Sequence, residues 1–310
     1  MVARLLLASP RGYCAGVERA VETVERALEL HGAPVYVRRQ IVHNTHVVRD
    51  LERRGAVFVE SEEDPPPGSL VVLSAHGVAP AVHDRAAVRR LRTIDAVCPL
   101  VTRVHAAVRR YAAAGYSIVL VGHADHQEVV GTRGEAPERI TVVETVHDAE
   151  RVSVPDPGRV AYATQTTLSI DDTIGIVAAL RRRFPAIHGP KKEDICYATT
   201  NRQEAVKAIA SRCDALVVIG APNSSNSVRL VEVAANCGCT KSRLVQRAAD
   251  MDWEWLGDSK RLGITAGASA PEHLVEELVG LCRRRYDITI EEVRTTEEHV
   301  VFKLPRELVG

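Results

Sequence analysis

The sequence is poor in aromatic residues, carries no net charge and contains no long apolar run near its start. Aromatic side chains make up 4% of the 310 residues, which argues against a surface that stacks nucleic-acid bases. The 40 basic residues balance 40 acidic ones, so the overall charge does not attract anions, and an anionic ligand must be bound by groups at its own site. The apolar run Leu5-Leu6-Leu7-Ala8 is too short for a signal sequence or a membrane span. We therefore expect a cytoplasmic protein that binds neither nucleic acid nor membrane.

Several familiar motifs are also missing. The seven cysteines are an odd number in a chain without an export signal, so a disulfide framework is not expected. No CxxC pair occurs, which weakens zinc-ribbon and ferredoxin-type interpretations. Neither GxxxxGK[ST] nor GxGxxG is found, which excludes a nucleotide P-loop and a Rossmann dinucleotide site. Metal binding, catalysis and burial in the core remain as roles for the cysteines.

Short β-type runs alternate with helical patterns along the whole chain. This alternation predicts an α/β protein with parallel sheets. The expected strands cover residues 35–42, 70–74, 117–121, 160–164, 215–220 and 262–265. The expected helices cover residues 17–30, 104–114, 171–184, 202–212 and 272–283.

Three cysteines divide the chain into similar parts. Cys14, Cys98 and Cys196 each precede a helical pattern. A polar motif follows each cysteine at a nearly equal interval, and a second polar motif follows at a later strand end. The layout predicts one α/β unit used three times, over residues 1–93, 94–191 and 192–310. Because parallel sheets bind ligands at the carboxyl ends of their strands, pseudo-threefold packing would bring the thiols and polar motifs to one central cavity.

Three thiols at helix N-termini suit a metal, because the helix dipole favours the thiolate. Zinc with three cysteines and one further ligand is one possibility. A [4Fe–4S] cluster with three protein ligands and one open iron is the other. Any single cysteine is better explained as a core residue, and Cys213 and Cys282 are interpreted that way.

The polar motifs at the strand ends offer many hydrogen-bond donors without a lysine. Serine, threonine and asparagine are ordinary helix N-caps, but five polar residues in a row at 223–227 exceed what one cap needs. Together with several histidines they predict a phosphate or diphosphate site. Glu128 lies two residues after His126, a spacing that lets the histidine hold the anion while the carboxyl group handles protons. A surface carboxylate is the alternative for Glu128.

The motifs together resemble those of a known family, the 4-hydroxy-3-methylbut-2-enyl diphosphate reductases of the non-mevalonate isoprenoid pathway. The resemblance covers most of the chain, and its motifs are long and occur in the family's order. They lie at residues 10–17, 42–44, 74–78, 98–102, 122–128, 164–169, 194–202, 223–227 and 265–271.

The resemblance implies a [4Fe–4S] cluster on Cys14, Cys98 and Cys196, at the centre of three α/β units related by pseudo-threefold symmetry. It implies that Glu128 delivers protons, with His126 and Thr166 completing the catalytic group and Thr166 near the substrate hydroxyl. The implied diphosphate site consists of His43, His76, His126, Ser224, Ser225, Asn226 and Ser269, with Thr166 beside it. Gln127 stands where the family usually has proline, which could loosen Glu128.

The implied reaction removes the hydroxyl group of an allylic diphosphate with two electrons and two protons, and yields isopentenyl and dimethylallyl diphosphate. No nicotinamide or flavin motif is present, so reduced ferredoxin or flavodoxin is the expected electron donor. Two alternatives from other classes use the same residues. One is a zinc or other mononuclear metal hydrolase that acts on a phosphorylated substrate. The other is a non-catalytic diphosphate-binding or cluster-sensing protein.

Overall fold

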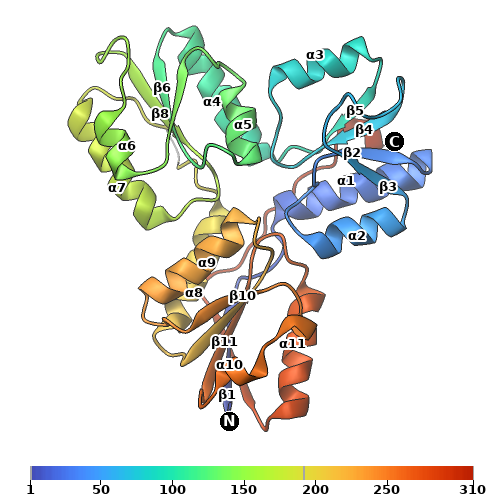
Figure 1. The fold of residues 1–310 in the computed structure, drawn as a ribbon, viewed down its shortest axis with the longest axis vertical. Coiled ribbons are helices and arrows are strands. Elements are labelled where there is room, and N and C mark those ends of the chain that lie inside the picture. Colours follow the sequence, from blue (N-terminus) through green and yellow to red (C-terminus); the bar gives the residue numbers. More distant parts are fainter. Residues whose placement is uncertain (1, 191–192, 310) are drawn as a thin grey trace. The chain divides into compact units, whose positions relative to one another are not determined.

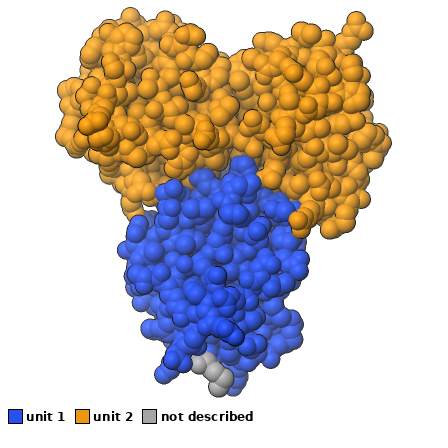
Figure 2. All heavy atoms as spheres, viewed as in Figure 1, with its two compact units in different colours: residues 1–17, 43–47, 197–301 blue, residues 18–42, 48–196, 302–310 orange. Residues whose placement is uncertain are grey.

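The structure is a computed structural model that describes residues 2–190 and 193–309. It contains three separate sheets, and every strand pair in them is parallel (Figure 1). The chain divides into two compact units, which Figure 2 shows in different colours. Unit 1 consists of residues 1–17, 43–47 and 197–301, and unit 2 of residues 18–42, 48–196 and 302–310. The predicted α/β class with three parallel-sheet parts is confirmed.

Unit 1 is built on a five-stranded sheet with the order β10-β9-β11-β1-β12. Its strands are β1 (Arg4–Ser9), β9 (Ala215–Ile219), β10 (Ser242–Val245), β11 (Arg261–Ala266) and β12 (Thr289–Arg294). Its helices are α8 (Tyr197–Ala210), α9 (Ser225–Asn236), α10 (Trp253–Leu256) and α11 (Glu272–Arg285).

Helices cover both faces of the unit 1 sheet. Successive strand residues point to opposite faces, and because both sets are apolar, each face needs helices to bury it. Leu5 of β1 belongs to a buried cluster with Leu274 and Leu278 of α11. Its neighbour Leu6 belongs to another cluster, with Val206 of α8 and Leu230 of α9. The apolar strands β1, β9 and β11 thus place both strand faces in the core, and the polar groups of their motifs lie beyond the strand ends.

Unit 2 contains two sheets. The first has the order β3-β2-β4-β5 and consists of β2 (Val35–Arg38), β3 (Ala56–Val59), β4 (Leu70–Leu73) and β5 (Arg92–Asp95). The second has the order β7-β6-β8 and consists of β6 (Ser117–Val121), β7 (Ile140–Val143) and β8 (Val160–Thr164). The associated helices are α3 (Pro80–Val88), α4 (Pro99–Ala113), α5 (Gln127–Arg133), α6 (Val146–Arg151) and α7 (Ile170–Arg183). Helices α1 (Ala15–His31) and α2 (Thr45–Arg53) begin in unit 1 and continue into unit 2.

Several element boundaries differ from the sequence prediction; for example, α8 begins at Tyr197 rather than at residue 202. The strand predicted over 35–42 ends at Arg38, because Arg39 has a positive φ of 57° and turns the chain away. The helix predicted from residue 104 begins at Pro99, whose fixed φ suits the first helical position. Strand β12 was not predicted, because its polar sequence TIEEVR lacks the apolar character of a buried strand.

The division into residues 1–93, 94–191 and 192–310 remains a proposal. Each segment supplies most of one sheet, but β1 pairs with β11 and β12, so the start of the chain joins the sheet of the last segment. In the described part of the chain, no helix combines the length and the apolar character that a membrane span requires.

Candidate functional site

Each of the three predicted cysteines lies directly before a helix. Cys14 precedes α1, Cys98 is the N-cap of α4, and Cys196 precedes α8. Their backbone N–H groups donate in the same manner to carbonyl oxygens of strand-end loops. Cys14 donates to Ala268 at 3.3 Å, Cys98 to Ala75 at 3.0 Å, and Cys196 to Thr166 at 3.0 Å.

The three loops that receive these hydrogen bonds are themselves fixed in one repeated way. Ala75 after β4, Gln165 after β8 and Gly267 after β11 donate their backbone N–H groups to Ile41, Val121 and Ile219, respectively, at or beyond the end of a neighbouring strand. The layout predicted from the sequence therefore recurs in the backbone hydrogen bonds. Each cysteine is tied to the polar motif of the sheet beside it, and Cys14 is tied to the motif that contains Ser269.

Solvent exposure separates these three cysteines from most of the others. Cys14, Cys98 and Cys196 are half-buried, as is Cys237, whereas Cys213, Cys239 and Cys282 are buried. Burial raises the pKa of Cys213 to about 12 and that of Cys282 to about 11, so these thiols stay protonated and inert. Cys213 lies just beyond α8 and Cys282 within α11, in agreement with their interpretation as core residues.

The thiols at the three turns fit an iron–sulfur cluster by their donor chemistry. All three side chains are partly accessible and stand at helix N-termini, and cysteine sulfur is the usual protein ligand of cluster iron. Among residues 2–190 and 193–309, no group of three or more histidine, cysteine, aspartate or glutamate side chains is arranged to hold a metal ion. The fit to a cluster therefore rests on the cysteine sulfur donors and on the backbone hydrogen bond that each cysteine makes to a strand-end loop.

In unit 1 the predicted anion-binding residues gather at the end of the sheet. Ser224 is the N-cap of α9, and its Oγ accepts from the N–H of Ser227 at 3.4 Å. The hydroxyl of Ser269 donates to the His43 carbonyl at 2.9 Å and lies 3.4 Å from Ser224 Oγ. Burial lowers the pKa of His43 to about 4, so this imidazole is neutral near pH 7. Ser225, the first residue of α9, is half-buried at the same place.

Asn226 connects this polar group to the turn of Cys14. Its Oδ1 accepts from the N–H of Ala268 at 2.9 Å, and its Nδ2 donates to Thr199 Oγ1 at 3.4 Å. Ala268 in turn accepts from the N–H of Cys14. The close approach requires glycine at residue 267, where a Cβ would lie only 2.0 Å from Ser227 Oγ. Unit 1 thus holds Cys14 and the N-terminus of α9 in one hydrogen-bonded arrangement.

In unit 2, Glu128 is buried and accepts two hydrogen bonds from Thr166. The N–H of Thr166 donates to Oε1 at 2.7 Å and its hydroxyl to Oε2 at 2.9 Å. Burial raises the pKa of Glu128 to about 7, and the hydrogen bonds from Thr166 only partly oppose this. A surface carboxylate, the alternative considered for Glu128, is excluded, since the residue is 3% exposed. Beside Gln127, both oxygens of the Glu128 carboxyl group are held by Thr166.

His126 lies beside Glu128 in unit 2, and His76 lies beside His126. His126 is the N-cap of α5, and its Nδ1 accepts from the N–H of Glu128 at 3.2 Å. In a neutral imidazole the proton is then on Nε2, which can donate to an anion. The rings of His126 and His76 meet edge to face with their centroids 5.9 Å apart. Motifs from the two sheets of unit 2 therefore come together at this point.

One important residue of unit 1 was not predicted from the sequence. Arg202 of α8 is fully buried and donates to the carbonyls of Gly12 and Tyr13, both at 2.9 Å. It also forms an ion pair with Glu298 at 3.0 Å. Arg202 is the last residue of the motif that begins at Asp194. Its place in that motif was the only sequence feature that could have indicated a role for it. It fixes the turn that presents Cys14.

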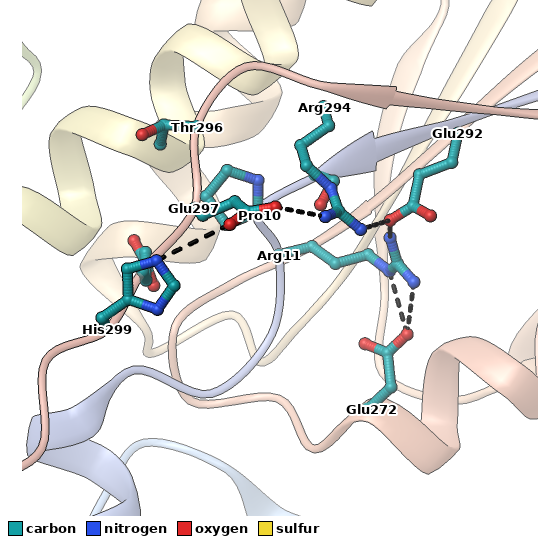
Figure 3. A pocket seen from close by; sticks show the side chains of 10 residues that line it. Pro10, Arg11, Glu272, Glu292, Arg294, Thr296, Glu297 and His299 are labelled. Atoms are coloured by element: carbon teal, nitrogen blue, oxygen red, sulfur yellow. Dashed lines mark hydrogen bonds and ion pairs between the residues drawn. The ribbon is translucent and has the colours of Figure 1, made fainter.

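A pocket of about 480 Å³ lies on the other side of that turn, next to Pro10 and Arg11 (Figure 3). Arg11 forms ion pairs with Glu272 at 2.5 Å and Glu292 at 3.4 Å, and Arg294 pairs with Glu297 at 2.8 Å. Figure 3 shows Arg11 between Glu272 and Glu292, and Arg294 beside Glu297. Two arginines thus face three glutamates, so these pairs leave no excess of positive charge that would attract an anionic ligand.

Comparison with known proteins agrees with these observations. The family model described as LytB protein matches residues 5–283. A relative from Acidothermus cellulolyticus, named 4-hydroxy-3-methylbut-2-enyl diphosphate reductase, is 58% identical over 98% of this chain and 90% of its own length. A relative of the same name from Paracoccus denitrificans is 57% identical over 98% of this chain and 96% of its own.

Solved structures give the same result. The E-1-hydroxy-2-methyl-but-2-enyl-4-diphosphate reductase from Plasmodium falciparum matches with a TM-score of 0.96 and 38% identity, over 100% of this chain and 98% of its own. A second structure, described as (E)-4-hydroxy-3-methyl-but-2-enyl diphosphate reductase, the terminal enzyme of the non-mevalonate pathway, matches with a TM-score of 0.64 and 32% identity. That match covers 92% of this chain and 100% of the other.

Proposed function

This chain belongs to the LytB protein family, and from that premise we propose how its residues carry out the family reaction. The chain is a reductase that acts on 4-hydroxy-3-methylbut-2-enyl diphosphate in the non-mevalonate pathway. The hydroxyl group leaves as water with two electrons and two protons, and the products are isopentenyl and dimethylallyl diphosphate. Because the reaction consumes protons at a carbon–oxygen bond and at carbon, it needs a placed acid that is protonated near neutral pH.

Glu128 is the acid in this proposal, and its environment is the observation that carries the assignment. An ordinary glutamate has a pKa near 4.3 and is ionised at pH 7, whereas burial raises the pKa of Glu128 to about 7. About half of the molecules then carry the proton at neutral pH. Thr166 orients the carboxyl group through two hydrogen bonds, and we place the Thr166 hydroxyl next to the substrate hydroxyl. His126 completes the catalytic group by donating from Nε2.

The diphosphate is held, in this proposal, by neutral donors. His43, His76 and His126 supply imidazole N–H groups, and Ser224, Ser225, Asn226 and Ser269 supply hydroxyl and amide donors. Ser224 and Ser225 stand at the N-terminus of α9, where the helix dipole favours an anion. Neutral donors bind the diphosphate without forming ion pairs that would slow the release of the diphosphate products.

We further propose that Cys14, Cys98 and Cys196 hold a [4Fe–4S] cluster. When bound, such a cluster supplies the electrons and a Lewis-acidic iron. The chain contributes thiolates at three helix N-termini, and each turn is fixed by the backbone hydrogen bond of its cysteine. Electrons are expected from reduced ferredoxin or flavodoxin.

The decisive experiment measures iron, acid-labile sulfide and zinc in anaerobically purified protein, followed by turnover of the allylic diphosphate with a chemical reductant. We expect about four iron and four sulfide per chain, together with formation of both products. Zinc without sulfide would support the metal hydrolase instead. A cluster without turnover, under conditions in which a relative is active, would support the sensor.

A further inference from the structure

Three arginines occupy equivalent places relative to the three cysteines of the proposed cluster. They are Arg19 on α1, five residues after Cys14, Arg103 on α4, five residues after Cys98, and Arg202 on α8, six residues after Cys196. Five or six residues make about one and a half helical turns. Each arginine is therefore carried by the same helix as the cysteine that precedes it.

Arg19 holds the turn of the next cysteine along the chain. Its Nη1 donates to the Val97 carbonyl at 2.9 Å, and its Nη2 donates to the Asp95 carbonyl at 3.4 Å. Val97 directly precedes Cys98, and Asp95 is the last residue of β5. The Nε of Arg19 donates to the Lys303 carbonyl at 2.7 Å. One guanidinium group of unit 2 thus ties the Cys98 turn to the C-terminal segment of the same unit.

Arg103 makes the equivalent contact to the third cysteine turn. Its Nη2 donates to the Glu193 carbonyl at 2.6 Å. Glu193 lies three residues before Cys196, just as Asp95 lies three residues before Cys98. Both partners belong to unit 2. The contact is exposed to solvent, so it is weaker than the contacts of Arg19.

Arg202 completes the cycle within unit 1. It donates to the carbonyls of the two residues directly before Cys14, and Glu298 compensates its charge. Helix α1 thus acts on the turn of Cys98, α4 on the turn of Cys196, and α8 on the turn of Cys14. The same kind of contact occurs three times, and each time it reaches the next cysteine rather than the one on its own helix.

The backbone ahead of each cysteine needs partners from outside its helix. Residues before the N-cap have non-helical backbone, so their carbonyls cannot join the hydrogen bonds of the helix. The ψ of 131° at Cys98 shows this extended entry. A guanidinium group presents five N–H donors in one plane and can join several carbonyls at once, whereas lysine offers a single point of attachment. Arginine is therefore suited to restrain such a turn.

We propose that Arg19, Arg103 and Arg202 are positioning residues, each of which fixes the turn of the next cysteine and so helps to retain iron there. This role rests on the proposed cluster on the three cysteines. The contacts join groups of the chain itself, so they restrain the turns whether or not iron is bound. A cysteine whose turn opens less often releases iron more slowly.

The test uses Arg19→Met in the anaerobically purified holoenzyme, with Arg26→Met as the matched control. Arg26 lies on the same helix and pairs with Glu29 at 2.6 Å. Hydrogen–deuterium exchange with mass spectrometry follows the backbone at residues 95–98 and 12–14. We expect exchange at 95–98 to become about tenfold faster in Arg19→Met, since loss of a charged hydrogen bond favours local opening by about this factor. Exchange at 12–14 should stay that of the wild type, and Arg26→Met should change neither segment.

The other two arginines extend the test around the cycle. Arg103→Met should speed exchange at residues 193–196, by a smaller factor because its contact is exposed, and Arg202→Met should speed exchange at residues 12–14. Release of iron to a chelator should accelerate about tenfold in Arg19→Met and stay unchanged in Arg26→Met. Arg19→Lys should resemble Arg19→Met, because it keeps the charge and loses the planar set of donors. If Arg202→Met does not fold, the Arg19 and Arg103 variants still decide the question.

Wild-type exchange at 95–98 in Arg19→Met would overturn the proposal, and so would an effect confined to residues 12–14. A uniform rise in exchange that includes β6 would indicate general destabilisation and would also overturn it. Full retention of the wild-type behaviour by Arg19→Lys would contradict bridging by the guanidinium group. Faster exchange with unchanged iron release would reject the role toward the cluster. Wild-type protein without iron and sulfide would instead refute the proposed cluster, while the exchange pattern would still test the arginine contacts.

Discussion

Glu128 and Thr166 form a two-point contact between the start of α5 and the loop after β8, in which one threonine donates to both oxygens of one buried carboxyl group. The contact fixes the carboxyl plane, because the backbone donor cannot rotate and the hydroxyl donor is held by the same residue. The next backbone link from Thr166 leads to Cys196, whose N–H donates to the Thr166 carbonyl. A single residue therefore connects the proposed acid to a proposed cluster ligand within unit 2.

Replacing Glu128 by glutamine should lower kcat by about 10²- to 10⁴-fold, since the amide keeps the shape but has no acidic proton. KM for the allylic diphosphate should change little. Steady-state kinetics under anaerobic conditions check this, with Glu138→Gln as a control at an exposed position. A variant with full turnover would contradict proton delivery by Glu128.

Glu128 also makes stability depend on pH. Its pKa in the folded state is about 7, above the ordinary value near 4.3, so between these values the folded protein binds more protons than the unfolded chain. The free energy of unfolding of the wild type should therefore fall as pH rises from about 4.5 to 7. Glu128→Gln lacks this contribution, and its stability relative to the wild type should increase by up to about 3 kcal/mol over that range. Denaturant titrations at several pH values measure the difference, and a constant difference would refute the raised pKa.

Serine in place of Cys14, Cys98 or Cys196 should remove most of the iron and sulfide, because a hydroxyl is a much poorer ligand for cluster iron than a thiolate. Cys237→Ser is the matched control, since Cys237 is equally half-buried but follows α9 at its C-terminal end. Metal analysis and the visible spectrum report the outcome. Equal iron content in all four variants would exclude the three cysteines as ligands.

Asn226→Asp should weaken diphosphate binding. The aspartate can still accept from the N–H of Ala268, so the local structure is kept, but it places a negative charge at the N-terminus of α9. We expect KM to rise at least about tenfold, which corresponds to about 1.4 kcal/mol. Inhibition by inorganic pyrophosphate should weaken in parallel. Asn236→Asp, at the exposed end of the same helix, should leave both values unchanged.

Arg202→Met should destabilise the protein by about 3–5 kcal/mol, because it leaves Glu298 and two backbone carbonyls without their buried partner. Arg212→Met removes a half-exposed ion pair with Glu291 and should change stability by less than about 1 kcal/mol. Urea denaturation compares the two variants. A small effect at Arg202 would show that the Cys14 turn is held by other contacts.

The apolar strands and the caps of the helices were the most predictable parts of the fold. The strands at 117–121 and 160–164 agree with β6 and β8 at both ends, because both are buried on both faces and bounded by polar turns. The arginine runs at 181–183 and 283–285 end α7 and α11, as the helix dipole favours. Strand β12 was not predicted, because it forms through its pairing with β1. The local sequence pattern of β12 contains no sign of that pairing.

Site residues could be predicted where similar residue types recur at similar intervals along the chain. They could not be predicted where their role depends on burial. The three cysteines and the strand-end motifs repeat, so their layout was visible in the sequence. Arg202 looks like an ordinary helix residue, since nothing in its spacing indicates that α8 buries it. Its importance comes from the backbone carbonyls and the carboxylate that tertiary packing brings to it.

The position of β1 between β11 and β12 has a consequence for how the protein is made. Strand β1 acquires its two neighbours only after residues 261–266 and 289–294 have been synthesised. The turn that carries Cys14 is fixed by Ala268 and Arg202, so it too must wait until most of the chain exists. Assembly of the proposed cluster is therefore a late event, since a nascent chain stalled before residue 260 lacks the contact with Ala268 that fixes the Cys14 turn.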